Sequence, residues 1–156
     1  MATTILLVMN GIGVPGRILP ALLADAYLGP LNTLIPSALC SSILLYSWAA
    51  VTSLQGLLVF AIIFGLVNSA VQGIQMSAMT SLTTDLSKVG TRLGMVLGIA
   101  SIAAVVGPPI AGQLIVAARG SFLYTQIFGG SATLLGVAFI CAARISETGF
   151  VLRRRM

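Results

Sequence analysis

The chain has eight Lys or Arg residues and three Asp or Glu residues. Arg17 lies inside a long apolar segment, whereas the other charged residues stand near the ends of such segments. A cation at the centre of a membrane helix costs about 2.5 to 3.5 kcal/mol on insertion scales, so it normally faces a protein interior or an aqueous cavity. Its planar guanidinium offers five donors that suit a carboxylate. Arg17 therefore predicts a substrate or gating site for an organic anion. Two other interpretations stay open: a permanent pair with an acid on a neighbouring helix, and a side chain that reaches the interface near Asp25.

Four amide side chains could serve the same anion. Asn10 opens the segment Asn10–Pro20, in which glycines and prolines permit close helix approach or local unwinding. Asn68, Gln72 and Gln75 recur at i, i+4 and i+7, which places them on one face of a helix. These residues either line a polar pathway and bind the solute, or hold neighbouring helices together, as amides do in membranes.

The fourth apolar segment carries a candidate hinge, formed by Gly107, Pro108, Pro109 and Gly112. The prolines remove backbone donors, so the helix is expected to be interrupted there by a kink or by a real discontinuity. Such a bend could act as a hinge or gate in an alternating-access protein, although static membrane helices are also kinked. Gly94 and Gly98 form a small-xxx-small pair in the same segment, which usually indicates tight helix packing.

The elements that must position these residues are membrane helices. Hydrophobic residues make up 58% of the chain and charged residues 7%, against about 25% charged residues in soluble domains. The uncharged stretches are long enough to cross hydrocarbon about 30 Å thick. The sequence therefore predicts an all-α membrane protein in which residues 1–145 form one transmembrane domain. Its five predicted spans cover residues 5–23, 31–51, 54–76 with a helical extension to about 84, 93–117 and 122–143.

Positive charge predicts the orientation of these spans. Lys88 and Arg92 follow the third span and Arg144 follows the fifth, whereas Arg119 stands alone on the opposite side. Lys and Arg are enriched on the cytoplasmic side of membrane proteins. The C-terminus is therefore predicted to be cytoplasmic, and residues 146–156 to form a basic cytoplasmic tail of a multi-pass protein.

Several function classes are disfavoured by composition. The chain has no His and three acidic residues, so it offers neither a metal-ligand set nor a Ser-His-Asp arrangement. Its net charge of +5 is not arranged as a stripe along which a nucleic-acid backbone could lie. We therefore expect no enzyme activity, metal, cofactor or nucleic acid, and membrane lipid as the surrounding partner.

Taken in order, these residues resemble a known family. Arg17 in the first span, Asp85 and Arg92 after the third, and Gly107–Gly112 in the fourth stand in the order seen in monocarboxylate transporters of the major facilitator superfamily. The run Pro15–Pro20 looks most like the fungal branch of that family. The resemblance covers nearly the whole chain but only part of a twelve-helix fold. The five spans match helices eight to twelve, the C-terminal portion.

The resemblance implies a secondary transporter, by symport, of a small organic anion such as a monocarboxylate, with the plasma membrane as the default location. It implies that Arg17 engages the substrate carboxylate. The best-known members have an aspartate one turn before this arginine, where the present chain has Gly13. Asp25, Asp85 and Arg92 correspond to charges of the cytoplasmic loops.

The resemblance also implies that one wall of the substrate cavity comes from outside this chain. Facilitator transporters bind solute between two halves that rock against each other, and the matching region begins at helix eight. The missing N-terminal half or another chain is expected to complete the cavity. Two further hypotheses stay open: a half-transporter that acts as an interaction or regulatory membrane subunit, and an inactive truncated product.

Overall fold

The computed structural model describes residues 2–24, 26, 29–81, 83 and 86–148. Two of the predicted loop charges, Asp25 and Asp85, lie outside the described residues. So does the predicted basic tail from residue 149 onward.

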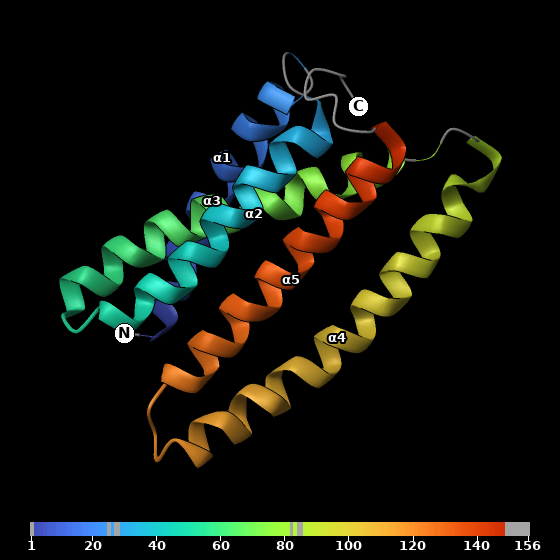
Figure 1. The fold of residues 1–156 in the computed structure, drawn as a ribbon. Coiled ribbons are helices and arrows are strands. Elements are labelled where there is room, and N and C mark those ends of the chain that lie inside the picture. Colours follow the sequence, from blue (N-terminus) through green and yellow to red (C-terminus); the bar gives the residue numbers. More distant parts are fainter. Residues whose placement is uncertain (1, 25, 27–28, 82, 84–85, 149–156) are drawn as a thin grey trace.

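All regular structure in the described residues is helical (Figure 1). Five helices are long and apolar enough to cross a membrane, which confirms the predicted all-α fold with five membrane-spanning helices. The third of them is described as helix to Ser81. Most of its expected extension to about residue 84 lies outside the described residues, so the extension stays a prediction. In chain order the elements are α1 (Ala2–Leu23), α2 (Pro30–Ser47), the 3₁₀ helix η2 (Trp48–Ala50), α3 (Leu54–Ser81), the 3₁₀ helix η3 (Leu86–Lys88), α4 (Val89–Ala117) and α5 (Leu123–Thr148).

Small residues allow α1 and α3 to pack at backbone distance. A Cβ atom added at Gly16 would lie 2.7 Å from the backbone oxygen of Leu66, so no side chain fits there without moving a helix. Association of helices inside a membrane depends on such van der Waals contact, because lipid tails are as apolar as the side chains. Contacts recur every four residues on both helices, and pair Met9 with Gly65, Gly13 with Ser69, and Arg17 with Gly73.

The α2 helix packs between α3 and α5, where both apolar and polar contacts hold it. The Ser42 hydroxyl donates a hydrogen bond of 2.9 Å to the carbonyl of Gly130, and the hydroxyls of Tyr46 and Ser131 lie 2.9 Å apart. Gly130 also makes room for the Tyr46 ring, which a Cβ atom at this position would approach to 2.8 Å. The buried core of this part consists of Leu31, Leu34, Ile74 and Ala78, with Val71 and Ile140 packed against it.

Aromatic rings join three segments at one end of the bundle. Trp48 in η2 stacks on Phe60 of α3 with ring centroids 5.7 Å apart, and its ring centroid lies 6.0 Å from that of Phe122, which precedes α5. Aromatic pairs at these separations stabilise beyond the area that they bury. The cluster therefore ties the end of α2 to the beginnings of α3 and α5.

The α4 helix stands apart from the other four. None of its residues is buried, and Figure 1 shows it beside α5 and away from α1. The hydroxyl of Thr125 on α5 donates to the Ala111 carbonyl of α4 over 3.4 Å. A Cβ atom at Gly94 or Gly98 would meet nothing within 4 Å. The tight packing expected of this glycine pair is therefore wrong for the described arrangement.

The candidate hinge lies within an unbroken helix. The α4 helix runs from Val89 to Ala117 with Pro108 and Pro109 inside it, so the alternative of a real discontinuity is wrong. Each proline removes one backbone hydrogen bond, and the bonds of the neighbouring turns suffice to continue the helix. Figure 1 shows α4 curving along its length. The hinge role of Gly107 and its neighbours stays a prediction.

Candidate functional site

Arg17 lies on α1, and its side chain reaches across to α3. Its Nη2 atom donates a hydrogen bond of 3.1 Å to Oε1 of Gln72. Both side chains are exposed. The contact joins two of the predicted site residues across 55 positions of sequence. The acidic side chains of the chain lie outside the described ones, so the alternative of an Arg–acid pair stays a prediction.

Glycines allow the backbone of Arg17 to approach α3 closely. A Cβ atom at Gly73 would lie 3.3 Å from both the Cβ and the backbone oxygen of Arg17. One turn before Arg17, a Cβ atom at Gly13 would lie 2.6 Å from the Ser69 hydroxyl. The position at which the resemblance places an aspartate is therefore occupied by a helix contact. A carboxylate side chain fits there only if the Ser69 side chain rotates or α1 moves away from α3.

The remaining amides do not converge on Arg17. Asn10 donates over 3.0 Å to the Leu6 carbonyl of its own helix. Asn68 and Gln75 are half-buried, and neither makes a hydrogen bond within the described part of the chain. The predicted amide stripe thus has two roles in the structure: Gln72 meets α1, whereas Gln75 lines a pocket on the side of α2 and α5.

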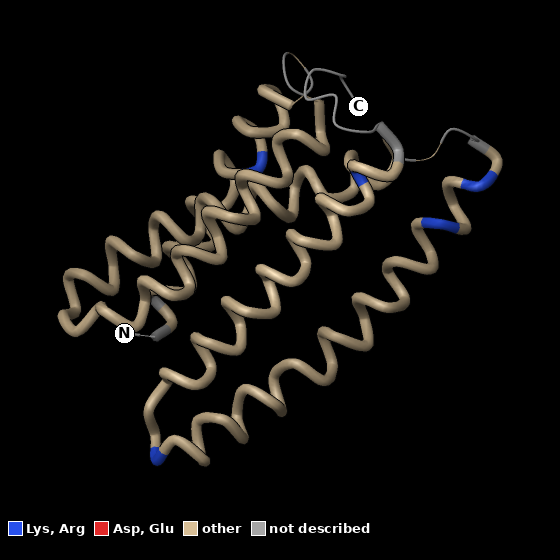
Figure 2. Tube along the Cα trace, in the orientation of Figure 1, with Lys and Arg blue, Asp and Glu red and all other residues tan. Residues whose placement is uncertain are grey.

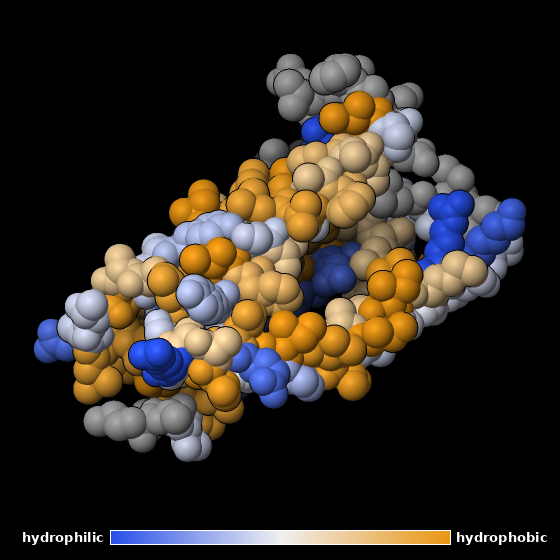
Figure 3. Space-filling view, turned by 60° about the horizontal axis from the view of Figure 1, so that its bottom comes forward, coloured by the Kyte–Doolittle hydropathy of each residue, from blue (hydrophilic) through white to orange (hydrophobic). Residues whose placement is uncertain are grey.

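This pocket has a volume of about 470 Å³ and opens between α2, α3 and α5. The volume falls within the range of small-molecule sites. Its walls are aliphatic except for Phe139, Gln75 and Thr133, and the Thr133 hydroxyl is bonded to the Gly129 carbonyl of its own helix. Figure 3 shows one hollowed face of the molecule, where hydrophobic side chains surround hydrophilic atoms at the base of the hollow.

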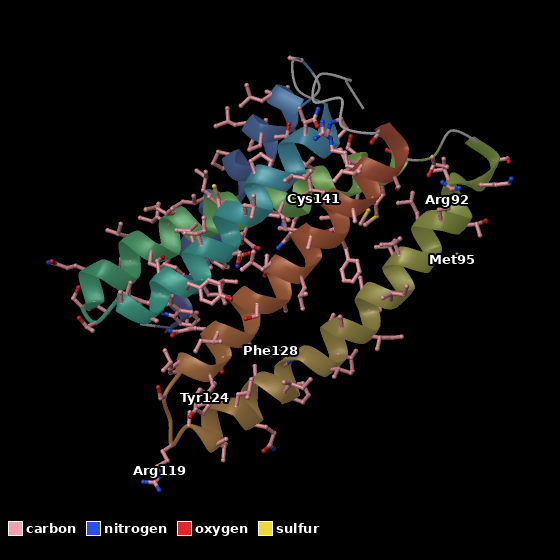
Figure 4. All side chains as sticks on the ribbon, viewed as in Figure 1. Arg92, Met95, Arg119, Tyr124, Phe128 and Cys141 are labelled. Atoms are coloured by element: carbon pink, nitrogen blue, oxygen red, sulfur yellow. The ribbon has the colours of Figure 1, made fainter. Side chains whose placement is uncertain are left out.

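Other predicted site residues lie away from Arg17. The candidate hinge Gly107–Gly112 belongs to α4, which packs beside α5, whereas Arg17 contacts α3. Arg92 lies in the first turn of α4, and Figure 4 shows Arg92 and Arg119 at opposite ends of this helix. The structure therefore brings Arg17 and Gln72 together and leaves the hinge and Arg92 elsewhere.

Apart from Arg17 on α1, the described cationic residues lie near the ends of α4 and α5 (Figure 2). Lys88 and Arg92 lie at the start of α4, and Arg144 lies in the last turns of α5. Because α4 and α5 form an antiparallel hairpin, these three residues share one end. Arg119 lies in the turn at the other end, in the left-handed backbone region with φ of 52°. Positive charge is thus concentrated at one end of α4 and α5.

A small-residue stripe on α3, which positions Arg17, was not predicted from the sequence. On α3, Ala61, Gly65, Ser69 and Gly73 recur every fourth residue. Ala61, Gly65 and Ser69 are buried, and the last three members of the stripe meet α1. This periodicity is the signal that could have predicted the contact, and it is longer than the isolated pair at Gly94 and Gly98.

The fold defines the class of protein first: a helical, multi-pass membrane protein with five candidate spans. Comparison with known proteins then gives several relatives. The chain is 37% identical to an MFS-type transporter of Gibberella zeae, over 92% of this chain and 32% of that protein. It is 35% identical to the agnestins efflux protein AgnL12 of Paecilomyces divaricatus, over 94% of this chain and 33% of that protein.

A further relative is the aspyridones efflux protein apdF of Emericella nidulans, at 28% identity over 93% of this chain and 29% of that protein. No family model matches the chain, and neither does any solved structure. The chain spans about a third of the length of these curated relatives. It is therefore homologous to a segment of MFS-type transporters, and the homology supports its membership in the major facilitator superfamily.

Proposed function

We propose that this chain is part of an MFS-type secondary transporter that moves a small organic anion such as a monocarboxylate, and that it corresponds to helices eight to twelve. The observation that carries the proposal is the Arg17 side chain. It is an exposed cation on an apolar helix, bonded to the neutral amide of Gln72. The neutral amide satisfies one donor and does not itself neutralise the positive charge. That charge favours an anion at membrane depth, where the effective dielectric constant is low.

Two of the relatives bear the name of efflux proteins, which supports transport of an organic molecule and favours export as its direction. The monocarboxylate assignment comes from the family resemblance and from the match between a guanidinium and a carboxylate. We also assign Gly107, Pro108, Pro109 and Gly112 in α4 as the hinge of the transport cycle. A helix with no buried residues has the freedom that such a motion needs.

Reconstitution tests this function. The full-length protein in liposomes is expected to exchange labelled benzoate, which is ionised at neutral pH, saturably against internal benzoate. Benzamide has the same shape without the charge, and it is expected to compete poorly. Vesicles that show no saturable benzoate exchange above protein-free vesicles would contradict the proposal.

A second candidate function is that of an interaction or regulatory membrane subunit. A membrane subunit that assembles with another chain would bury the exposed surfaces of α4 and of Arg17 in its partner. The same reconstitution separates the two functions. The pure protein exchanges benzoate if it is a transporter, whereas an interaction subunit gives no exchange until its partner is added.

We further propose that the C-terminus is cytoplasmic and that the protein resides in the plasma membrane. The end of the bundle that carries Lys88, Arg92 and Arg144 then faces the cytoplasm, in accord with the positive-inside rule.

Single cysteines test this orientation after the free thiols of Cys40 and Cys141 are replaced by alanine. Ser121→Cys, in the turn between α4 and α5, is expected to react with a membrane-impermeant maleimide in intact cells. Ser87→Cys in η3 is expected to react only after permeabilisation. The reverse labelling pattern would overturn the orientation.

A further inference from the structure

We propose that Gln72 is a positioning residue, which holds the guanidinium of Arg17 against α3 so that the cation meets an incoming carboxylate in one orientation. The proposal rests on the proposed function, in which Arg17 binds the carboxylate of the substrate. It assigns to Gln72 an action through Arg17, in place of the direct substrate contact that the sequence predicts.

Two consecutive residues of α3 contact Arg17, one at its backbone and the other at the tip of its side chain. Gly73 lies against the Arg17 backbone, where an added Cβ atom would be 3.3 Å from the Arg17 backbone oxygen. Gln72 accepts the hydrogen bond from Nη2 at the tip of the side chain, at 3.1 Å. A long side chain that is anchored at both ends has lost much of its rotamer freedom before the substrate arrives. Such preorganisation raises affinity because less ordering remains to be done on binding.

The choice of an amide has an electrostatic consequence. The glutamine oxygen accepts a hydrogen bond but carries no formal charge, and a guanidinium has five N–H donors. Gln72 therefore orients Arg17 without neutralising it and without using all its donors. A carboxylate at the same position would form an ion pair with Arg17, and it would compete with the substrate for the cation.

Within the described residues, Gln72 contacts Arg17 and the neighbouring amide Gln75 does not. Gln75 lies three residues further along α3, lines the pocket toward α2 and α5, and makes no hydrogen bond within the described residues. Residues three apart are neighbours on a helix surface, with about 5–6 Å between their Cβ atoms. The orientation of α3 relative to α1 therefore decides which of the two amides contacts Arg17.

The test measures the equilibrium affinity of the full-length purified protein for benzoate and for its uncharged analogue benzamide. Gln72→Leu is expected to weaken benzoate binding about tenfold, the order expected for loss of a hydrogen bond to a charged group. Benzamide binding is expected to stay unchanged, because the fold and the apolar contacts are intact. Gln113→Leu makes the same chemical change at an exposed glutamine on α4, and it is expected to change neither affinity.

A second variant keeps the test valid if Gln72→Leu is poorly folded. Gln72→Glu preserves an oxygen acceptor of equal reach, so it is expected to keep the wild-type melting temperature. It places a negative charge beside Arg17, and so it is expected to weaken benzoate binding at least as much as leucine does.

The outcomes separate this inference from the function on which it rests. Equal weakening of benzoate and benzamide in Gln72→Leu would show that Gln72 supports the fold or touches the substrate itself, and would overturn the positioning role. Unchanged benzoate affinity in both Gln72 variants, with lowered affinity in Arg17→Ala, would overturn the positioning role alone. Unchanged benzoate affinity in Arg17→Ala would overturn the proposed function and the inference together.

Discussion

Liposomes that contain the Arg17→Ala variant are expected to exchange benzoate no faster than protein-free liposomes. The substitution removes the cation that the Gln72 amide holds on α3. Hydrogen bonds to charged groups contribute about 1.5–3 kcal/mol each, so loss of a carboxylate pair lowers affinity at least about tenfold. Counterflow of labelled benzoate, at equal protein density, measures the effect.

Two further measurements serve as controls for this result. Arg17→Lys keeps the charge without the planar fork, so partial exchange with a raised KM is expected. Insertion of Arg17→Ala into the membrane is expected to equal or exceed that of the wild type, because a cation at membrane depth is costly. Wild-type exchange rates in Arg17→Ala would exclude this residue from the substrate site.

The second large effect concerns the contact between α1 and α3. Gly16→Ala is expected to lower the melting temperature of the purified protein in detergent. The added Cβ atom would lie 2.7 Å from the backbone oxygen of Leu66 and 3.0 Å from its Cα, which forces the helices apart. Overpacking of this kind costs about 1–3 kcal/mol, which exceeds the gain of up to about 1 kcal/mol that alanine brings to a helix interior.

Gly11→Ala provides the matched control on the same helix. A Cβ atom at Gly11 meets nothing within 4 Å, so only the gain in helix propensity remains, and the melting temperature is expected to be unchanged or slightly raised. The two variants therefore differ in sign. Equal melting temperatures for Gly11→Ala and Gly16→Ala would show that α1 and α3 are not in the described contact.

The five-helix fold could be predicted because its cause is local. An uncharged stretch of about 20 residues must satisfy its backbone polar groups internally when it lies in lipid, and a helix does so. An interruption of the helix at Pro108 and Pro109 was also predicted from local sequence, yet α4 continues through both residues. Proline weakens a helix by a limited number of hydrogen bonds, and the sequence does not show how well the adjacent turns compensate.

The residues of the candidate site could be predicted from the sequence, but the pairing of Arg17 with Gln72 could not. Periodicity placed Asn68, Gln72 and Gln75 on one face of α3, and Arg17 was identified from its cost in lipid. Which amide meets Arg17 depends on the register between α1 and α3. That register is set by glycine and serine contacts between positions more than fifty residues apart, and it follows from tertiary packing rather than from local sequence.

The packing of α1 against α3 accounts for one departure from the monocarboxylate-transporter resemblance, at position 13. Gly13 stands where an aspartate precedes the arginine in the best-known members. A Cβ atom added there would lie 2.6 Å from the Ser69 hydroxyl, so a larger residue requires the Ser69 side chain or the helices to move. In this chain that position serves helix packing. Any coupling of protons to transport must therefore use groups other than an aspartate at position 13.

Arg17 is proposed to select for an anion at membrane depth. The most direct measurement compares the dissociation constants of benzoate and benzamide for the purified wild-type protein and for Arg17→Ala. We predict that the wild type binds benzoate at least about tenfold more tightly than benzamide, and that the variant binds the two alike. Equal affinities in the wild type, or a preference for benzoate that survives in Arg17→Ala, would contradict the claim.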